Sequence, residues 1–164
     1  MAFVSIIMGS KSDYDVMKGC AETLEKFDVA YEILVSSAHR SPDRTHEYVK
    51  EAEEKGAKVF VCAAGMAAHL AGVVASLTTK PVIGVPMKGG LMDGLDSLLS
   101  TVQMPGGMPV ATVAVGKAGA TNAAYLAIQI LALSDDGLAK KLLKDKEKKA
   151  KAVEEDSKTL EKRI

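Results

Sequence analysis

Two short polar segments, residues 9–13 and residues 36–43, each directly follow an apolar run that is typical of a buried strand. Between them they hold several serines, two aspartates, a histidine and an arginine. In an open α/β sheet, ligands bind in the crevice at the carboxyl ends of the strands. We therefore expect both segments to face one crevice, where they supply a phosphate cradle, a cation and a group able to move protons.

The first segment has the composition of a binding site for a single phosphate group. Its order Gly-Ser-Lys-Ser-Asp lacks the spacing of a Walker A loop and of the three-glycine dinucleotide fingerprint, which disfavours ATP and NAD as ligands. A hydroxyl-rich turn from a strand into a helix presents backbone amides and the hydroxyls of Ser10 and Ser12 to a phosphate monoester. Asp13 can accept hydrogen bonds from ribose hydroxyls. The alternative is a plain turn in which Ser12 or Asp13 caps the following helix.

The second segment places a histidine next to an arginine, just before a predicted helix start. His39 suits general acid–base catalysis, because histidine changes its charge near neutral pH. Arg40 can clamp a phosphate with the planar fork of its guanidinium group. Ser41 is expected to cap the helix that Pro42 begins. The competing interpretation of His39 is a loop histidine that bonds only to backbone.

A third turn, residues 63–70, is rich in glycine and alanine, so that backbone can approach a ligand closely there. It contains His69, which either orients another group or simply starts a helix. His46 lies among charged residues of a predicted helix and is interpreted as a surface residue. The dispersed histidines and the two distant cysteines, Cys20 and Cys62, have neither metal-ligand nor redox spacing. We expect no metal, and two buried thiols in a reducing compartment.

The overall composition gives the protein no net positive charge that would attract a polyanion. The formal net charge is zero and 26% of the residues are charged, so neither nucleic acid nor a membrane is an expected partner. Aromatic residues make up only 4% of the chain, too few for base-stacking platforms. The apolar start at residues 3–8 has no basic flank and is too short for a signal peptide or a membrane span, so we expect a cytoplasmic protein.

Apolar runs and helix-like stretches follow one another along the chain, and most of the runs are continuously apolar. Continuous runs are typical of parallel strands that helices cover on both faces. We predict an α/β fold with a three-layer, doubly wound parallel sheet. The expected strands are residues 3–8, 30–35, 59–64, 81–85 and 110–115, and the expected helices are residues 13–27, 42–55, 67–77, 94–102 and 118–133. A single domain, residues 1–164, would join this core, residues 1–133, to a C-terminal helix, residues 134–164.

That final segment reads as a long charged helix with one narrow apolar seam. Residues 140–163 hold ten Lys and Arg against six Asp and Glu, and such interspersed acids favour a solvated face over contact with nucleic acid. Asp135 and Asp136 suit the positive end of the helix dipole. Because the sheet already has its helices, we expect the seam to pack on a neighbouring subunit, the alternative being a helix docked on its own domain. The seam consists of Leu138, Leu142, Leu143, Ala150, Val153 and Leu160.

A series of ordered blocks, from the first strand to about residue 133, is similar to the PurE family of purine biosynthesis. The blocks are Met-Gly-Ser-Lys-Ser-Asp at residues 8–13, Ser-Ala-His-Arg-Ser-Pro at 37–42, Ala-Ala-His-Leu at 67–70, Gly-Val-Pro at 84–86, Gly-Leu-Asp-Ser-Leu at 94–98, Gln-Met-Pro-Gly-Gly-Met-Pro-Val at 103–110 and Asn-Ala-Ala at 122–124. Their order along most of the chain is far more specific than any one block.

The resemblance implies a flavodoxin-like sheet, a homo-octamer and a small ribonucleotide substrate, with no cofactor. The mutases of the family are isomerases that convert N5-carboxyaminoimidazole ribonucleotide to 4-carboxy-5-aminoimidazole ribonucleotide. A second class, the alternative here, carboxylates aminoimidazole ribonucleotide directly with carbon dioxide. Arg40 after the histidine and the order Ala67-Ala68-His69 resemble the mutases. Met66, where mutases commonly carry Gly, and Ala71, where they commonly carry Pro, depart from the pattern.

The resemblance also implies roles for the residues of the three loops. His39 would be the catalytic residue, passing a proton to the departing nitrogen and removing one from the ring carbon. Residues 103–108 would form a lid over their own site or a neighbour's.

The alternative from a different functional class is a non-catalytic nucleotide-binding module that uses the same phosphate cradle. The expected substrate-binding residues are Ser10, Ser12 and Arg40 at the phosphate, Asp13 at the ribose, and Ser37, Gly65, Ala67, Ala68, His69 and Leu70 around the carbon dioxide.

Overall fold

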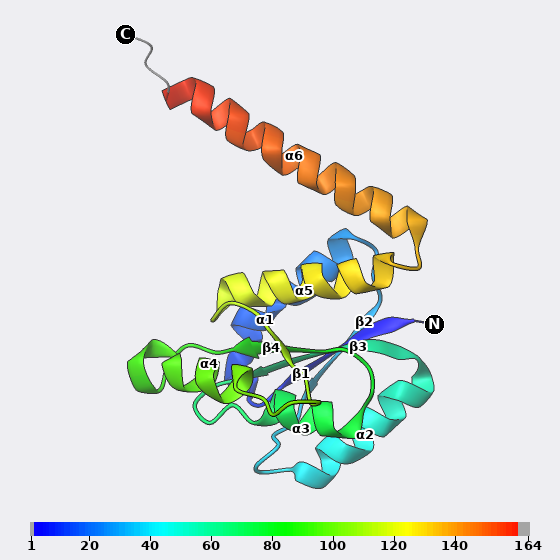
Figure 1. Ribbon diagram of the computed structural model, residues 1–164, viewed down its shortest axis with the longest axis vertical. Coiled ribbons are helices and arrows are strands. Elements are labelled where there is room, and N and C mark those ends of the chain that lie inside the picture. Colours follow the sequence, from blue (N-terminus) through cyan, green and yellow to red (C-terminus); the bar gives the residue numbers. More distant parts are fainter. Residues whose placement is uncertain (1, 161–164) are drawn as a thin grey trace. The chain divides into compact units, whose positions relative to one another are not determined.

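The apolar runs of the sequence form one parallel sheet in the computed structural model, which describes residues 2–160 (Figure 1). The strand order is β2-β1-β3-β4-β5, with all neighbours parallel. This is the flavodoxin-like order, in which the chain reverses direction across the sheet between β1 and β3. The strands are β1 Phe3–Met8, β2 Tyr31–Val35, β3 Ala57–Ala64, β4 Val82–Pro86 and β5 Ala111–Thr112.

The central strands are buried on both faces, as continuous apolar runs predict. All residues of β1 and β4 are buried, whereas the edge strand β2 is half-buried or exposed along its length. The expected fifth strand, residues 110–115, is shorter than predicted. Only Ala111 and Thr112 pair regularly with β4. Beyond them this edge segment stays on β4 only through single backbone bonds, from Val113 to Gly84 and from Gly116 to Pro86.

The helices lie between the strands where the sequence places them, with bounds that shift by a few residues. The third helix begins at Leu70 rather than at residue 67, because residues 66–69 fold into tight turns. The helices are α1 Tyr14–Lys26, α2 Pro42–Lys55, α3 Leu70–Leu77, α4 Leu95–Val102, α5 Lys117–Ala132 and α6 Asp136–Leu160, with short 3-10 turns η1 Lys11–Asp13 and η2 Leu91–Asp93.

Helices cover the sheet from both sides and so create its two hydrophobic layers (Figure 1). On one face, α2 and α3 pack on the strands around Phe60 and Cys62. Thr101 of α4 lies on this same face, directly over Gly84. On the opposite face, Gly119 of α5 lies against Val85, and α1 lies beside α5. The rigid layers leave the loops at the carboxyl ends of the strands free to carry chemistry.

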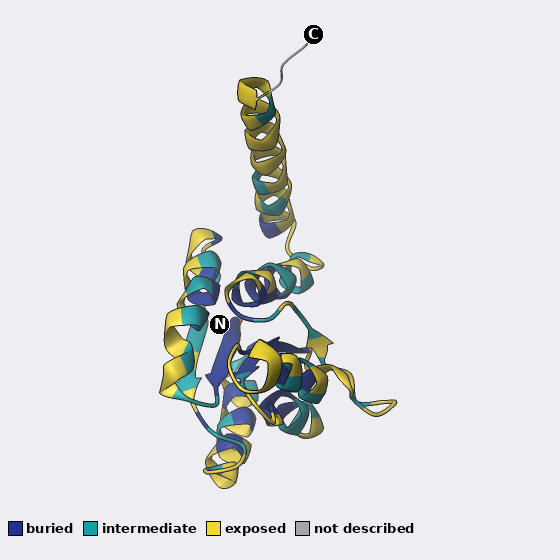
Figure 2. Cartoon of the chain, turned by 90° about the vertical axis from the view of Figure 1, so that its left-hand side faces the viewer, coloured by how far each residue is buried: buried dark blue, intermediate teal, exposed yellow. Residues whose placement is uncertain are grey.

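The chain divides into two compact units, Met1–Ile128 and Gln129–Ile164. The sheet belongs to the first unit, and α6 belongs to the second. Asp135 lies at the N-terminus of α6, where the helix dipole favours it, and its carboxylate also caps the helix by accepting a hydrogen bond from the Leu138 amide at 2.9 Å. Within the described part of α6, most side chains are exposed (Figure 2). Among residues 2–160, no helix is long and apolar enough to cross a membrane.

Candidate active site

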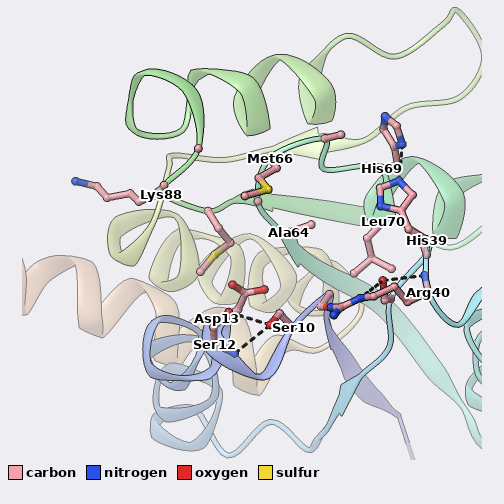
Figure 3. A pocket seen from close by; sticks show the side chains of 18 residues that line it. Ser10, Ser12, Asp13, His39, Arg40, Ala64, Met66, His69, Leu70 and Lys88 are labelled. Carbon is pink, nitrogen blue, oxygen red and sulfur yellow. Dashed lines mark hydrogen bonds between the residues drawn. The ribbon is translucent and has the colours of Figure 1, made fainter.

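A cavity of about 590 Å³ opens at the carboxyl ends of the strands, where the three predicted loops meet (Figure 3). It lies at the switch point between β1 and β3, the place where open α/β sheets bind ligands. The first loop contributes Gly9, Ser10, Ser12 and Asp13, the second contributes Ser37, Ala38, His39 and Arg40, and the third contributes Ala64, Gly65, Met66, Ala67, His69 and Leu70.

The first loop is organised by the hydroxyl of Ser10. Its Oγ accepts a hydrogen bond from the Ser12 amide at 3.3 Å and another from the Ser12 hydroxyl at 2.9 Å. The prediction that Ser12 or Asp13 supplies the helix cap was wrong: Asp13 occupies the cap position of α1 but makes no side-chain capping bond. The reason is that the chain enters α1 through the η1 turn, so Ser10 satisfies the first free amide instead.

Burial changes the acidity of the carboxyl group in this loop. Desolvation raises the pKa of Asp13, and a backbone hydrogen bond from Ser10 offsets part of that rise. A ligand that donates hydrogen bonds to this half-buried carboxylate stabilises its ionised form, because the donors replace the water that the carboxylate has lost. Ribose hydroxyls are donors of this kind.

The second and third loops bring two imidazole rings together. His39 Nε2 and His69 Nδ1 are 2.8 Å apart, and the rings meet edge to face with centroids 4.8 Å apart (Figure 3). One ring must donate and the other accept in this hydrogen bond, so the tautomer of each ring is coupled to that of its partner. His39 is therefore not a loop histidine bonded only to backbone, and His69 does more than start a helix.

Arg40 ties the second loop to the first. One guanidinium nitrogen donates to the Gly9 carbonyl at 3.2 Å, and Nε lies 3.5 Å from the Ser37 hydroxyl, which also accepts from the Arg40 amide. Ser41 occupies the cap position of α2, ahead of Pro42, as predicted, but its side chain makes no capping bond. Its hydroxyl is engaged with the backbone of Ser37, donating to the carbonyl at 3.1 Å and accepting from the amide at 3.0 Å. The hydroxyls of Ser37 and Ser41 thus bond within the loop and hold its shape.

The third loop is a pair of tight turns with a strained residue at its tip. The Ala68 amide donates to the Met66 carbonyl at 2.9 Å, and the His69 amide donates to the Ala67 carbonyl at 2.8 Å. Met66 has a φ of 53°, a left-handed conformation that costs a residue other than glycine roughly 1 kcal/mol. The amides of Ala68 and His69 are therefore engaged within the loop, and Ala68, one of the expected binding residues, is buried and does not line the cavity.

A fourth loop lines the cavity and was not singled out from the sequence. Met87, Lys88, Gly89 and Gly90 follow β4 and form the wall beyond Met66. The same rule that located the first three loops would have located this one, since it follows the fourth apolar run. Of the described residues, those from 103 to 108 do not line the cavity, so their expected role as a lid is not seen in this form.

Neither cysteine takes part in the site. Cys20 and Cys62 are free and buried, and burial raises the pKa of Cys20 to about 12, which leaves its thiol protonated and unreactive at neutral pH. Within the part of the chain that the structure describes, no group of three histidines, cysteines or carboxylates is placed to hold a metal ion. The candidate chemistry therefore rests on the histidine pair, the arginine and the hydroxyl groups.

The chain is similar in sequence and in structure to known proteins. A family model described as AIR carboxylase matches residues 3–152. The N5-carboxyaminoimidazole ribonucleotide mutase of Pyrococcus horikoshii is 54% identical over 158 residues, covering 96% of this chain and 88% of the relative. That of Bacillus subtilis is 53% identical over 154 residues, covering 94% and 95%. The crystal structure of Treponema denticola PurE superposes with a TM-score of 0.89 at 28% identity, covering 99% of this chain and 100% of that one.

Substitution of Asp13 tests the electrostatics of the first loop. Because the pKa of Asp13 is raised in the folded state, the ionised carboxylate costs stability at neutral pH, and this cost fades as the pH falls through that pKa. We expect Asp13→Asn to raise the melting temperature at pH 7, with a gain that shrinks toward pH 4. Asp15→Asn, at an exposed position in the first turn of α1, the helix that Asp13 precedes, is the matched control. A melting temperature at pH 7 that is no higher than in wild type would contradict the assignment.

Proposed function

The chain belongs to the AIR carboxylase family and catalyses the mutase reaction of purine biosynthesis, and we propose that His39 carries the protons of that reaction. The enzyme converts N5-carboxyaminoimidazole ribonucleotide to 4-carboxy-5-aminoimidazole ribonucleotide, which makes it an isomerase. The observation that supports the proposal is the 2.8 Å bond from His39 to His69 in a cavity that Ser10 and Ser12, the expected phosphate cradle, also line.

The reaction moves one carboxylate and two protons. The carbamate carbon–nitrogen bond breaks, and its electron pair returns to the exocyclic nitrogen, which takes a proton from His39. Carbon dioxide remains in the cavity, and C4 of the imidazole donates an electron pair to its carbon to form the new bond. The proton on C4 then passes to His39, which restores the starting state. Confinement makes the second bond formation effectively unimolecular.

The ribonucleotide is held by the first two loops. We assign the phosphate to Ser10, Ser12 and Arg40. Two of the five N–H donors of Arg40 are engaged with Gly9 and Ser37, so its position is fixed while further donors face a ligand. Asp13 is assigned to the ribose hydroxyls, whose hydrogen bonds stabilise its half-buried carboxylate.

Carbon dioxide is assigned to the third loop and the start of α3. The helix begins at Leu70 with no side-chain cap, so its first amides and the positive end of its dipole lie at the cavity. This field favours the carboxylate that forms as C4 attacks. Ser37, Gly65 and Ala67 complete the small-walled pocket, and Ala68 supports it from behind.

His69 is assigned a positioning role. Its Nδ1 contacts Nε2 of His39, so it fixes the tautomer and the ring orientation of the residue that meets the substrate. In this arrangement the two loops that carry the rings must keep their spacing, so that His39 can give a proton to the exocyclic nitrogen and take one from C4.

Replacement of His39 tests the proton carrier. In His39→Asn, we expect turnover of N5-carboxyaminoimidazole ribonucleotide, without added bicarbonate, to fall about 10²- to 10⁴-fold, which is the range for loss of a general acid–base group. Binding of the product, followed by calorimetry, should change little because the phosphate contacts remain. His46→Asn is the matched control, since His46 is exposed on α2 and does not line the cavity. Near-normal turnover in His39→Asn would remove this residue from the mechanism.

We also propose that the enzyme works as a homo-oligomer, an octamer, in the cytoplasm. Two exposed apolar surfaces support assembly: Leu91, Met92, Leu99 and Val102 in the first unit, and Leu143, Val153 and Leu160 on α6 in the second, each between 47% and 81% exposed. Exposed apolar surface of this extent is characteristic of protein–protein contacts. Two free thiols suit a reducing compartment.

Removal of α6 tests its part in assembly. Truncation after Ser134 should lower the mass of the particle in light scattering, because it deletes the exposed seam of α6. Leu143→Glu, which places a charge on the seam, should weaken assembly as well, whereas Lys144→Glu, beside the seam, should not. An unchanged mass in both the truncated chain and Leu143→Glu would assign assembly to other surfaces.

A further inference from the structure

The fourth loop, residues 87–90, and the η2 turn after it have an unusual backbone. Five of the six residues from 89 to 94 have a positive φ. The polar contacts within this segment are long and exposed: Lys88 Nζ lies 3.5 Å from the Asp93 carboxylate, and the Gly89 amide lies 3.4 Å from it. A backbone of this kind persists only where its surroundings determine it. The shape of the fourth loop is therefore set by contacts from outside the loop.

Two side chains at the start of α4 bind this segment. The buried Ser97 hydroxyl donates a hydrogen bond that is shared between the carbonyl of Met87, at 2.7 Å, and that of Gly94, at 2.9 Å. The Asp96 carboxylate accepts from the Leu91 amide at 2.9 Å and from the Ser97 amide at 2.8 Å. Gly94 permits the close approach, because a Cβ there would lie 3.1 Å from the Met87 carbonyl oxygen. The segment from Met87 to Leu91 is thus bound to α4 at both ends.

Met87 connects these contacts to the carbon dioxide pocket. Its amide donates to the Ala64 carbonyl at 2.9 Å, where β3 ends and the third loop continues. Met87 is 5% exposed, lines the cavity and lies beside Gly65, since a Cβ on Gly65 would be 3.6 Å from the Cβ of Met87. A shift of Met87 therefore moves an apolar wall of the pocket and disturbs the third loop at the same time.

We propose that Asp96 and Ser97 are positioning residues of the mutase, which hold Met87 and the fourth loop in place as a wall of the carbon dioxide pocket. The inference rests on the proposed function. Neither residue lines the cavity, so both act through the loop. Carbon dioxide is uncharged and a weak hydrogen-bond acceptor, so its place beside C4 depends on the shape of the pocket and not on a charged partner.

A displaced wall affects the bond-forming step more than it affects binding. The phosphate and the ribose are assigned to the first two loops, whereas Asp96 and Ser97 bind the fourth. Loss of either side chain should therefore leave the ribonucleotide bound and slow the attack of C4 on carbon dioxide, because that attack depends on alignment. Carbon dioxide that is not captured leaves the site. The nitrogen has by then taken its proton from His39, C4 keeps its own, aminoimidazole ribonucleotide is released, and His39 recovers a proton from solvent.

Ser100, on the same helix, provides a matched control. Its hydroxyl donates to the Asp96 carbonyl at 2.7 Å, a bond as long as that from Ser97 to Met87, but this bond lies within α4. Ser97→Ala and Ser100→Ala therefore remove the same chemical group from the same helix. Only the first removes a contact to the cavity wall.

The experiment measures kcat and KM for N5-carboxyaminoimidazole ribonucleotide in wild type, Ser97→Ala, Asp96→Ala and Ser100→Ala, at a temperature where melting curves show each to be folded. It also measures the fraction of substrate released as aminoimidazole ribonucleotide, corrected for loss without enzyme. For Ser97→Ala we expect kcat to fall about tenfold or more with KM little changed, and the released fraction to rise. Asp96→Ala should change both quantities in the same direction, and Ser100→Ala should match wild type.

An unchanged kcat and released fraction in folded Ser97→Ala would overturn the positioning role and leave the mutase assignment intact. An equal fall of kcat in Ser100→Ala would also overturn it, as would a raised KM with unchanged kcat, because the effect would then belong to the helix or to binding. If Ser97→Ala does not fold, Asp96→Ala decides by the same readouts, since the Leu91 that it binds is exposed. A wild-type enzyme that does not convert the substrate would instead contradict the proposed function.

Discussion

The hydrogen bond between His39 and His69, 2.8 Å long, is the interaction on which the site depends: the fold must hold two loops from different strands close enough for their rings to touch. Its two rings come from the loops after β2 and β3, which lie on either side of β1 in the sheet. For the rings to touch, both loops must reach across the end of β1, where the Ser10 cradle lies. The order of the strands thus places the proton carrier beside the phosphate site. Arg40 fastens this arrangement by bonding from the second loop to the Gly9 carbonyl of the first.

The stability of the site comes from the scaffold and not from the loops. The strands β1, β3 and β4 are buried between helical layers, whereas His39, Arg40 and His69 are exposed. The loops hold their shapes through short-range bonds among their own hydroxyls and amides, such as those between Ser37 and Ser41. Such a site is preorganised before the ligand binds, and the bound ligand then covers the side chains that are exposed without it.

The sequence predicts those features that depend on local chemistry. Strand β1 and helix α2 have the bounds expected from the apolar run and from Pro42, and Gly56, with a φ of 110°, ends α2. The side-chain capping bonds of α1 and α2 were mispredicted, because a serine hydroxyl can bond to any of several nearby groups and only the folded loop decides between them. The pairing of His39 with His69 was not predicted, since it depends on where two loops, 30 residues apart, aim their rings. The fourth loop follows the fourth apolar run, so its position was predictable; it was missed because Lys88 is its only side chain with polar chemistry and two glycines follow it.

In the proposed mechanism His69 acts through His39 and not on the substrate itself. A double-mutant cycle tests this claim directly, using single-turnover rates for His39→Asn, His69→Phe and the double variant. If one ring works only through the other, the double variant loses no more rate than His39→Asn alone, because the interaction is already broken. Losses that multiply, with the double variant slower than His39→Asn by the full factor of His69→Phe, would show that the two histidines act independently and would contradict the account.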